Sequence, residues 1–310
     1  MKGNLKFKIG FLASLTSLIW GSAFAFTKIG LEYMPPLRLS GYRFMFAGLI
    51  LIPILILKNY DWKELKGQFL YLLGFGFIQT FLQYGFFFSG LNLAPSAISS
   101  IIIGAGPFFV AILAHFFIKG DRINFRKAIS ILLGLSGVIF IALKNNVSLS
   151  EYPKFHLGVI LLLTGNLLGA ATNIMVVNYN RKISTTALTS FSCLFGGIML
   201  LLLSFFAEPE GGRGIIGYPA EFYWALLWLA IIPALGFSIW YYIITRPEVK
   251  VSEVAVWKFL IPVFGVLLSW LLLKNESPEI YSIIGIVIIS ISIIVLQTKP
   301  RKWKSRKWKF

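Results

Sequence analysis

Long apolar runs, each about as long as a helix that crosses a lipid bilayer, are separated by short polar segments along this chain. An apolar run of about 18 to 22 residues can cross the roughly 30 Å hydrocarbon core of a bilayer as an α-helix. The sequence has ten such runs, separated by short polar connections: Ile9–Lys28, Leu37–Leu57, Phe69–Ser89, Ser96–Ile118, Ala128–Leu143, His156–Val177, Thr186–Phe206, Phe222–Ile244, Val251–Leu273 and Ile280–Leu296. The pattern predicts an all-α polytopic membrane protein with ten transmembrane helices.

One part of this pattern occurs twice. Pro107 interrupts an apolar run and Lys119 follows it after twelve residues; 155 residues later, Pro262 and Lys274 repeat that spacing. In both copies an acidic residue comes two positions after the lysine. A proline inside a helix removes a backbone hydrogen bond, which lipid tolerates only where neighbouring helices or a cavity satisfy the carbonyl that is left over. We therefore expect Pro107 and Pro262 to be paired hinges of a duplicated core.

The duplication divides the chain into two repeats of five spans each. Because five is an odd number, the two repeats must cross the membrane in opposite directions. We expect a first repeat over 1–148, a second and inverted repeat over 149–298, and a basic cytoplasmic tail over 299–310. Inverted repeats permit alternating access, in which one half rocks against the other around a central site.

Composition places the chain in a membrane and excludes several other classes of protein. Hydrophobic residues make up 57% of the sequence and charged residues 13%, and the mean hydropathy is +0.79. The connections between spans are too short to hold a soluble catalytic domain. The single cysteine, Cys193, lies within an apolar run and cannot form an intramolecular disulfide.

The basic residues predict the orientation of the spans. When loops are assigned to alternate sides, 21 of the 29 Lys and Arg residues fall on the side that carries both termini, and 6 fall on the other side. By the positive-inside rule both termini are cytoplasmic, in a multi-pass protein of the cytoplasmic membrane. The N-terminal lysines before Ala23-Phe24-Ala25 imitate a signal peptide, but we expect an uncleaved first span because cleavage would leave nine helices.

Several short motifs, taken in order along nearly the whole chain, resemble one transporter family. They are Trp20-Gly21-Ser22, Pro35-Pro36 leading to Arg43, Leu93-Ala94-Pro95-Ser96-Ala97, Pro107, Lys119 to Arg122, Val251-Ser252-Glu253-Val254-Ala255, and Pro262 followed by Lys274-Asn275-Glu276. This set is similar to the EamA branch of the drug/metabolite transporter superfamily. The resemblance implies two inverted five-helix repeats around a cavity lined by spans 1, 3, 4, 6, 8 and 9. It also implies transport of small metabolites, often amino acids and frequently outward.

One departure from the wider superfamily limits what the resemblance implies. The first span lacks the membrane-embedded Glu that the small multidrug-resistance relatives use for proton-coupled export of cations. That chemistry is therefore not implied for this chain.

Polar and aromatic residues recur on single faces of several spans. Spacings of three and four residues place them on one side of a helix, and polar groups that persist in hydrocarbon usually face the bundle interior or a wet cavity. The alternative is helix packing, with amides bonded to a neighbouring helix, and interfacial anchoring for the two tryptophans. We expect a substrate cavity formed by Trp20, Gln79, Gln83, Asn166, Asn173, Ser238, Tyr241, Trp257 and Lys258.

Charge within the spans is scarce. Lys258 lies about seven residues into the ninth span, where its ammonium could bind a substrate carboxylate or phosphate, or else extend to the interface. We expect Arg43 to be structural and to bond backbone carbonyls at a helix end. No Asp or Glu lies at the centre of a span. The sequence therefore indicates neither a carboxylate proton relay nor an enzyme, and we predict no catalytic residue, metal ligand or cofactor.

The tail over 299–310 has seven basic residues and two Trp. Next to a membrane helix, such a segment suits anionic lipid headgroups better than nucleic acid. The partners that we expect are thus a small-molecule substrate and the lipid bilayer. The sequence leaves the oligomeric state open and is compatible with a monomer.

These observations predict a secondary transporter that works by alternating access. Because Lys258 has no acidic residue at comparable depth, we expect the cavity to be neutral to positive and to prefer amino acids or related small carboxylates to lipophilic cations. We expect the direction of transport to be export. Transport of nucleosides, sugar phosphates or drugs is the alternative within this class. A non-transporting membrane scaffold or lipid-handling protein is the alternative from another class.

Overall fold

The computed structural model describes residues 2–94, 96–142, 153–179, 183–209, 214–272 and 278–298, and within these ranges the regular secondary structure is entirely helical. Ten of the described segments are long and apolar enough to cross a membrane. The prediction of an all-α protein with ten spans is therefore confirmed. The expected tail over 299–310 and the second-copy motif at Lys274 to Glu276 lie outside the described residues.

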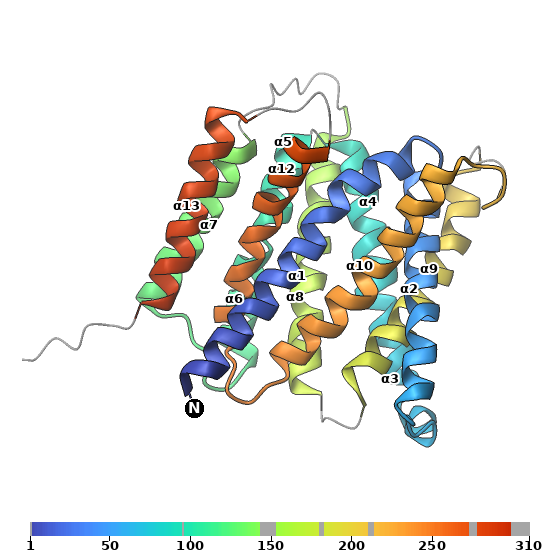
Figure 1. Ribbon diagram of the computed structural model, residues 1–310, viewed down its shortest axis with the longest axis horizontal. Coiled ribbons are helices and arrows are strands. Elements are labelled where there is room, and N and C mark those ends of the chain that lie inside the picture. Colours follow the sequence, from blue (N-terminus) through green and yellow to red (C-terminus); the bar gives the residue numbers. More distant parts are fainter. Residues whose placement is uncertain are drawn as a thin grey trace, which may run out of the picture.

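The ten spans are not ten simple helices, because the third, fourth and ninth are each built from successive helical segments (Figure 1). In lipid the backbone groups of such segments must still be satisfied within the protein. The elements in chain order are α1 (Lys2–Leu31), α2 (Pro36–Leu57), α3 (Lys63–Gly76), the π-helix η1 (Phe77–Leu82), α4 (Gln83–Leu93), α5 (Ser96–Gly104), α6 (Gly106–Phe117), α7 (Phe125–Ala142), α8 (Phe155–Asn178), α9 (Thr185–Ala207), α10 (Ala220–Ile244), α11 (Val251–Ala255), the 3₁₀-helix η3 (Val256–Phe259), α12 (Leu260–Leu272) and α13 (Ile280–Gln297).

The two prolines that mark the repeat follow helix breaks. The fourth span breaks at Ala105, and Pro107 lies in the first turn of α6. In the ninth span η3 precedes α12, and Pro262 is the third residue of that helix. A first-turn residue needs no intrahelical N–H bond, so proline is readily accommodated at both positions. Pro53 and Pro233, which the sequence analysis did not single out, lie inside the continuous helices α2 and α10.

Helices α7 and α13 pack side by side at one end of the molecule (Figure 1). The hydroxyl of Ser130 donates to the carbonyl of Ser292 at 2.8 Å, and the hydroxyl of Ser292 donates to the carbonyl of Ser130 at 2.7 Å. Two turns along, Gly137 and Gly285 bring the two backbones close together. Residue numbers rise along α7, from Ser130 to Gly137, while those of their partners on α13 fall, from Ser292 to Gly285. The two helices are therefore antiparallel.

These two contacts are related by the 155-residue spacing of the repeat. Adding 155 to Ser130 gives Gly285, and adding 155 to Gly137 gives Ser292. The serine pair and the glycine pair are thus exchanged when one copy of the repeat is mapped onto the other. Antiparallel helices related in this way are what an approximate two-fold axis between the copies would produce.

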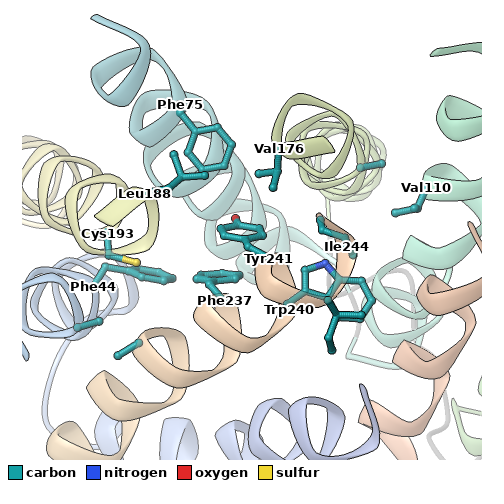
Figure 2. Packing of buried hydrophobic residues seen from close by; sticks show 14 of the residues in the cluster. Phe44, Phe75, Val110, Val176, Leu188, Cys193, Phe237, Trp240, Tyr241 and Ile244 are labelled. Atoms are coloured by element: carbon teal, nitrogen blue, oxygen red, sulfur yellow. The ribbon is translucent and has the colours of Figure 1, made fainter. Parts of the chain in front are cut away.

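A second pair, α2 and α9, packs at the other end (Figure 1). Gly41, Gly48 and Gly197 allow the close approach, and the hydroxyl of Ser190 donates to the Gly48 carbonyl at 2.8 Å. Between the two pairs, α1 packs against α10 and α12, and α8 packs against α4 and α6. Buried aromatic side chains from α2, α3 and α10 join in the core cluster there (Figure 2).

The close contact between α7 and α13 can be tested by adding a methyl group at Gly137 and measuring the free energy of unfolding. A Cβ on Gly137 would lie 2.8 Å from the Gly285 carbonyl oxygen and closer still to Ile289, so Gly137→Ala should lower the free energy of unfolding by about 1–3 kcal/mol. Gly74→Ala on α3 is the matched control, because nothing lies within 4 Å of its Cβ position. It should be neutral or stabilising by up to ~1 kcal/mol. Thermal unfolding in detergent measures both, and equal effects would contradict the packing described.

Candidate functional site

The ammonium group of Lys258 lies between two indole rings. Its Nζ is 4.2 Å from the ring centroid of Trp240 and 5.2 Å from that of Trp20. The two ring centroids are 5.6 Å apart, with the planes inclined at 53°. Trp20 comes from α1, Trp240 from α10 and Lys258 from η3, so three spans meet at this point. We call these three residues the indole–lysine site.

Aromatic faces are the only stabilising partners that the described structure records for this ammonium. The ion pairs recorded around the start of the ninth span join Lys127 to Asp121 and Glu253, and Lys250 to Glu253; Lys258 takes part in none of these three. Cation–π contact stabilises an ammonium by about 0.5–2 kcal/mol, less than the cost of holding an unpaired charge in hydrocarbon. An anion placed beside Lys258 would neutralise this charge.

Asn173 fixes the orientation of the Trp240 ring. The indole Nε1 donates to Asn173 Oδ1 at 2.5 Å, and Asn173 Nδ2 donates to the carbonyl of Gly169 at 2.5 Å. Both ends of the amide are engaged within the protein. Asn173, which the sequence analysis assigned to the cavity, thus contributes by holding a wall of the site in place.

An aromatic wall extends from the site along α10. Phe237 lies 5.8 Å from Trp20 and 5.7 Å from Tyr241, with which it stacks at 10°, and Tyr241 meets Phe75 at 5.9 Å between ring centroids. Figure 2 shows Phe237, Trp240 and Tyr241 projecting from this helix toward the core. Sequence analysis identified Tyr241 but not Phe237 or Trp240. The available signal was their spacing of three and four residues, which places all three aromatics on one helical face.

Of the two glutamines in the third span, Gln83 lies against the face of α8 that carries Asn173. The Gln83 amide nitrogen would be 2.8 Å from a Cβ on Gly169, one turn from Asn173. Gln79 is buried in η1, where its Oε1 accepts from the Thr80 hydroxyl at 2.6 Å and its Nε2 has no recorded partner. π-Helical segments often re-aim side chains at functional sites. The buried hydroxyl of Ser238, on α10, likewise has no recorded partner.

Two of the residues expected in the cavity have contacts elsewhere. The side-chain amide of Asn166 donates to the carbonyl of Ile102, just before the break between α5 and α6. That carbonyl also accepts from the N–H of Ala105 at 3.1 Å, so the Asn166 amide adds a second bond at the helix break. The Trp257 ring lies against Gly10, and its carbonyl accepts from the Ser17 hydroxyl at 2.9 Å. The structure thus places both outside the indole–lysine site.

Arg43 contacts aromatic rings rather than the backbone carbonyls that we expected. It is buried within α2, its guanidinium carbon lies 4.8 Å from the Phe44 ring centroid and 5.9 Å from that of Tyr84, and its Nε has no recorded partner. No bond from Arg43 to a backbone carbonyl is recorded in the described part of the chain. The protein interior thus holds a second cation that, like Lys258, rests on aromatic rings.

Comparison with known proteins identifies the family. Residues 8–143 and 156–298 match the EamA-like transporter family. An uncharacterized transporter of Archaeoglobus fulgidus is 30% identical over 94% of this chain and 97% of its own length. A protein of Escherichia coli K12 named "Probable amino-acid metabolite efflux pump" is 28% identical over 93% of this chain and 94% of its own length.

A solved crystal structure shares the fold, with a TM-score of 0.79 at 20% sequence identity over 93% of this chain and 95% of that one. The named relatives are transporters rather than enzymes. Together with the ten candidate spans and the family match over both halves, these findings show that the chain is a multi-pass membrane protein and belongs to the EamA-like transporter family of the drug/metabolite transporter superfamily.

Proposed function

We propose that this transporter carries amino acids or related small carboxylates, and that Lys258 binds the carboxylate. The observation that carries the proposal is the position of Lys258 between Trp20 and Trp240 without an acidic partner in the described structure. A substrate carboxylate would supply the missing charge. A cationic drug would instead meet like charge in a medium of low dielectric constant, where repulsion is poorly screened.

Polar groups inside the bundle also suit a small polar metabolite. The buried amide nitrogen of Gln79 and the buried hydroxyl of Ser238 have no recorded partner, and the Gln83 amide lies beside Gly169, one turn of α8 from Asn173. The aromatic wall along α10 would contact the apolar part of the ligand. The name of the Escherichia coli relative supports the same substrate class and an outward direction of transport.

Alternating access between two inverted repeats is the proposed mechanism. The support comes from α7 and α13, which are antiparallel and whose contacts are exchanged by the 155-residue spacing. Helix breaks before Pro107 and Pro262 would let parts of each half move without distorting a continuous helix. Their role as hinges stays a prediction.

We further propose that the protein lies in the cytoplasmic membrane with both termini inside the cell. The 21 to 6 bias of basic residues supports this orientation. We also propose that the basic tail over 299–310 binds anionic lipid headgroups on the cytoplasmic side.

Single cysteines test the orientation. In a Cys193→Ala background, Asn59→Cys lies in an exposed turn after α2, and Ile216→Cys replaces an 81% exposed residue before α10. Because these connections are on opposite sides of the proposed topology, an impermeant maleimide should label Asn59→Cys only from inside and Ile216→Cys only from outside. The reverse pattern would invert the orientation.

Substitution of Lys258 tests the substrate class. Purified protein would be screened for thermal stabilisation by amino acids, other carboxylates, nucleosides, sugar phosphates and lipophilic cations, since a ligand of the native state raises its stability. We expect a carboxylate to stabilise most. Lys258→Ala should weaken its binding roughly 10- to 100-fold, in line with the loss of a charged hydrogen bond, and Lys258→Arg should retain part of it.

Lys250→Ala is the control for this experiment, because Lys250 is half-exposed near the start of the same span. It should leave the affinity unchanged. Carboxylate binding that survives Lys258→Ala, or stabilisation mainly by cations, would show that Lys258 does not bind the substrate.

A further inference from the structure

A second charged cluster lies where the fourth and fifth spans are joined. Asp121 follows α6, and Lys127 lies in the first turn of α7; they are 1% and 0% exposed, and Lys127 Nζ lies 2.7 Å from Asp121 Oδ1. Lys127 also donates to the carbonyl of Arg122 at 3.0 Å. Unlike Lys258, this lysine has its charge fully matched within the protein.

The cluster bonds one half of the chain to the other. The backbone N–H of Ser252 donates to Asp121 Oδ2 at 2.9 Å, and the Ser252 hydroxyl donates to Asp121 Oδ1. Lys127 Nζ donates to the same hydroxyl at 2.7 Å. Asp121 thus caps the first turn of the ninth span from a loop more than a hundred residues earlier. We call Asp121, Lys127 and Ser252 the Asp121 latch.

The latch joins the segment that carries the proposed substrate site. Ser252 is in α11, and Lys258 follows six residues later in η3. Glu253 strengthens the contact, since its carboxylate lies 3.8 Å from Lys127 Nζ. Any movement of α11 away from α6 and α7 must break the latch and also shift the chain next to Lys258.

The residues that correspond to the latch when the two copies of the repeat are exchanged can form fewer charged contacts. At a spacing of 155, Asp121 corresponds to Glu276, Ser252 to Ala97 and Lys127 to Ser282. At these positions the corresponding set keeps a carboxylate, but alanine replaces the serine of the latch and serine replaces its lysine.

We propose that the Asp121 latch holds the cytoplasmic side of the transporter closed and opens once in each transport cycle. This proposal rests on the alternating access and the orientation proposed above. Asp121, Lys127 and Ser252 are positioning residues, which act on the substrate through the ninth span. Because its counterpart is weaker, the latch biases the resting protein toward the state that is closed to the cytoplasm.

Opening of the latch can be measured by the labelling rate of a cysteine placed on α11, the helix that contains Ser252. Ala255→Cys, in a Cys193→Ala background, places a thiol at a fully buried position of α11, which packs against α6. An impermeant maleimide should label it slowly from either side of oriented vesicles. Adding Asp121→Asn, or the milder Ser252→Ala, should raise the labelling rate about tenfold from the cytoplasmic side only.

Asp61→Asn is the matched control, because Asp61 is an exposed aspartate that we assign to the same side and that bonds only within its own half, to the N–H of Lys63 at 3.0 Å. It should leave labelling unchanged. A rate that stays constant in both latch variants, rises equally in the control, or rises from both sides as in general loosening would overturn the proposal. The assay needs no substrate, so it is decided separately from the test of carboxylate binding.

Discussion

A charge in the hydrocarbon interior needs a partner, and this requirement explains the arrangement around Lys258. The ammonium is flanked by Trp20 and Trp240, whose faces stabilise it without neutralising it. The amide of Asn173 holds Trp240 in that position. Three spans thus converge to keep one cation in place while leaving its charge unmatched, which is the arrangement that a site for anionic substrate requires.

Lys127 and Lys258 show that the same type of side chain can have different surroundings in one protein. Lys127 is paired with Asp121 and bonded to Ser252. Removing either charged residue of the pair would strand a buried charge, a change that commonly costs about 3–5 kcal/mol. Lys258 has no such partner in the described structure. The Lys127–Asp121 ion pair is either formed or broken, so it can mark two states of the protein. The ammonium of Lys258, which has no acidic partner, can bind and release a ligand. This difference is the reason that we propose gating for Lys127 and substrate binding for Lys258.

Periodicity predicted the ten spans, because burial in lipid leaves a strong pattern of apolar and polar positions. It also singled out Lys258 and Trp20, which the structure places side by side. It did not predict that Asn173 would bond Trp240, or that Asn166 would bond the carbonyl of Ile102 at a helix break. A stripe on one helix specifies which face is polar but not which neighbour meets it. Those neighbours come from packing between distant spans, which no local pattern encodes.

The most direct test of the central claim is a structure determined with the carboxylate that stabilises the protein most. The account predicts a carboxylate oxygen about 3 Å from Lys258 Nζ, a hydrogen-bond distance, beside the rings of Trp20 and Trp240. A ligand bound elsewhere, with Lys258 still held between the indoles and in contact with nothing else, would contradict it. So would a ligand that turns a cationic group toward this lysine.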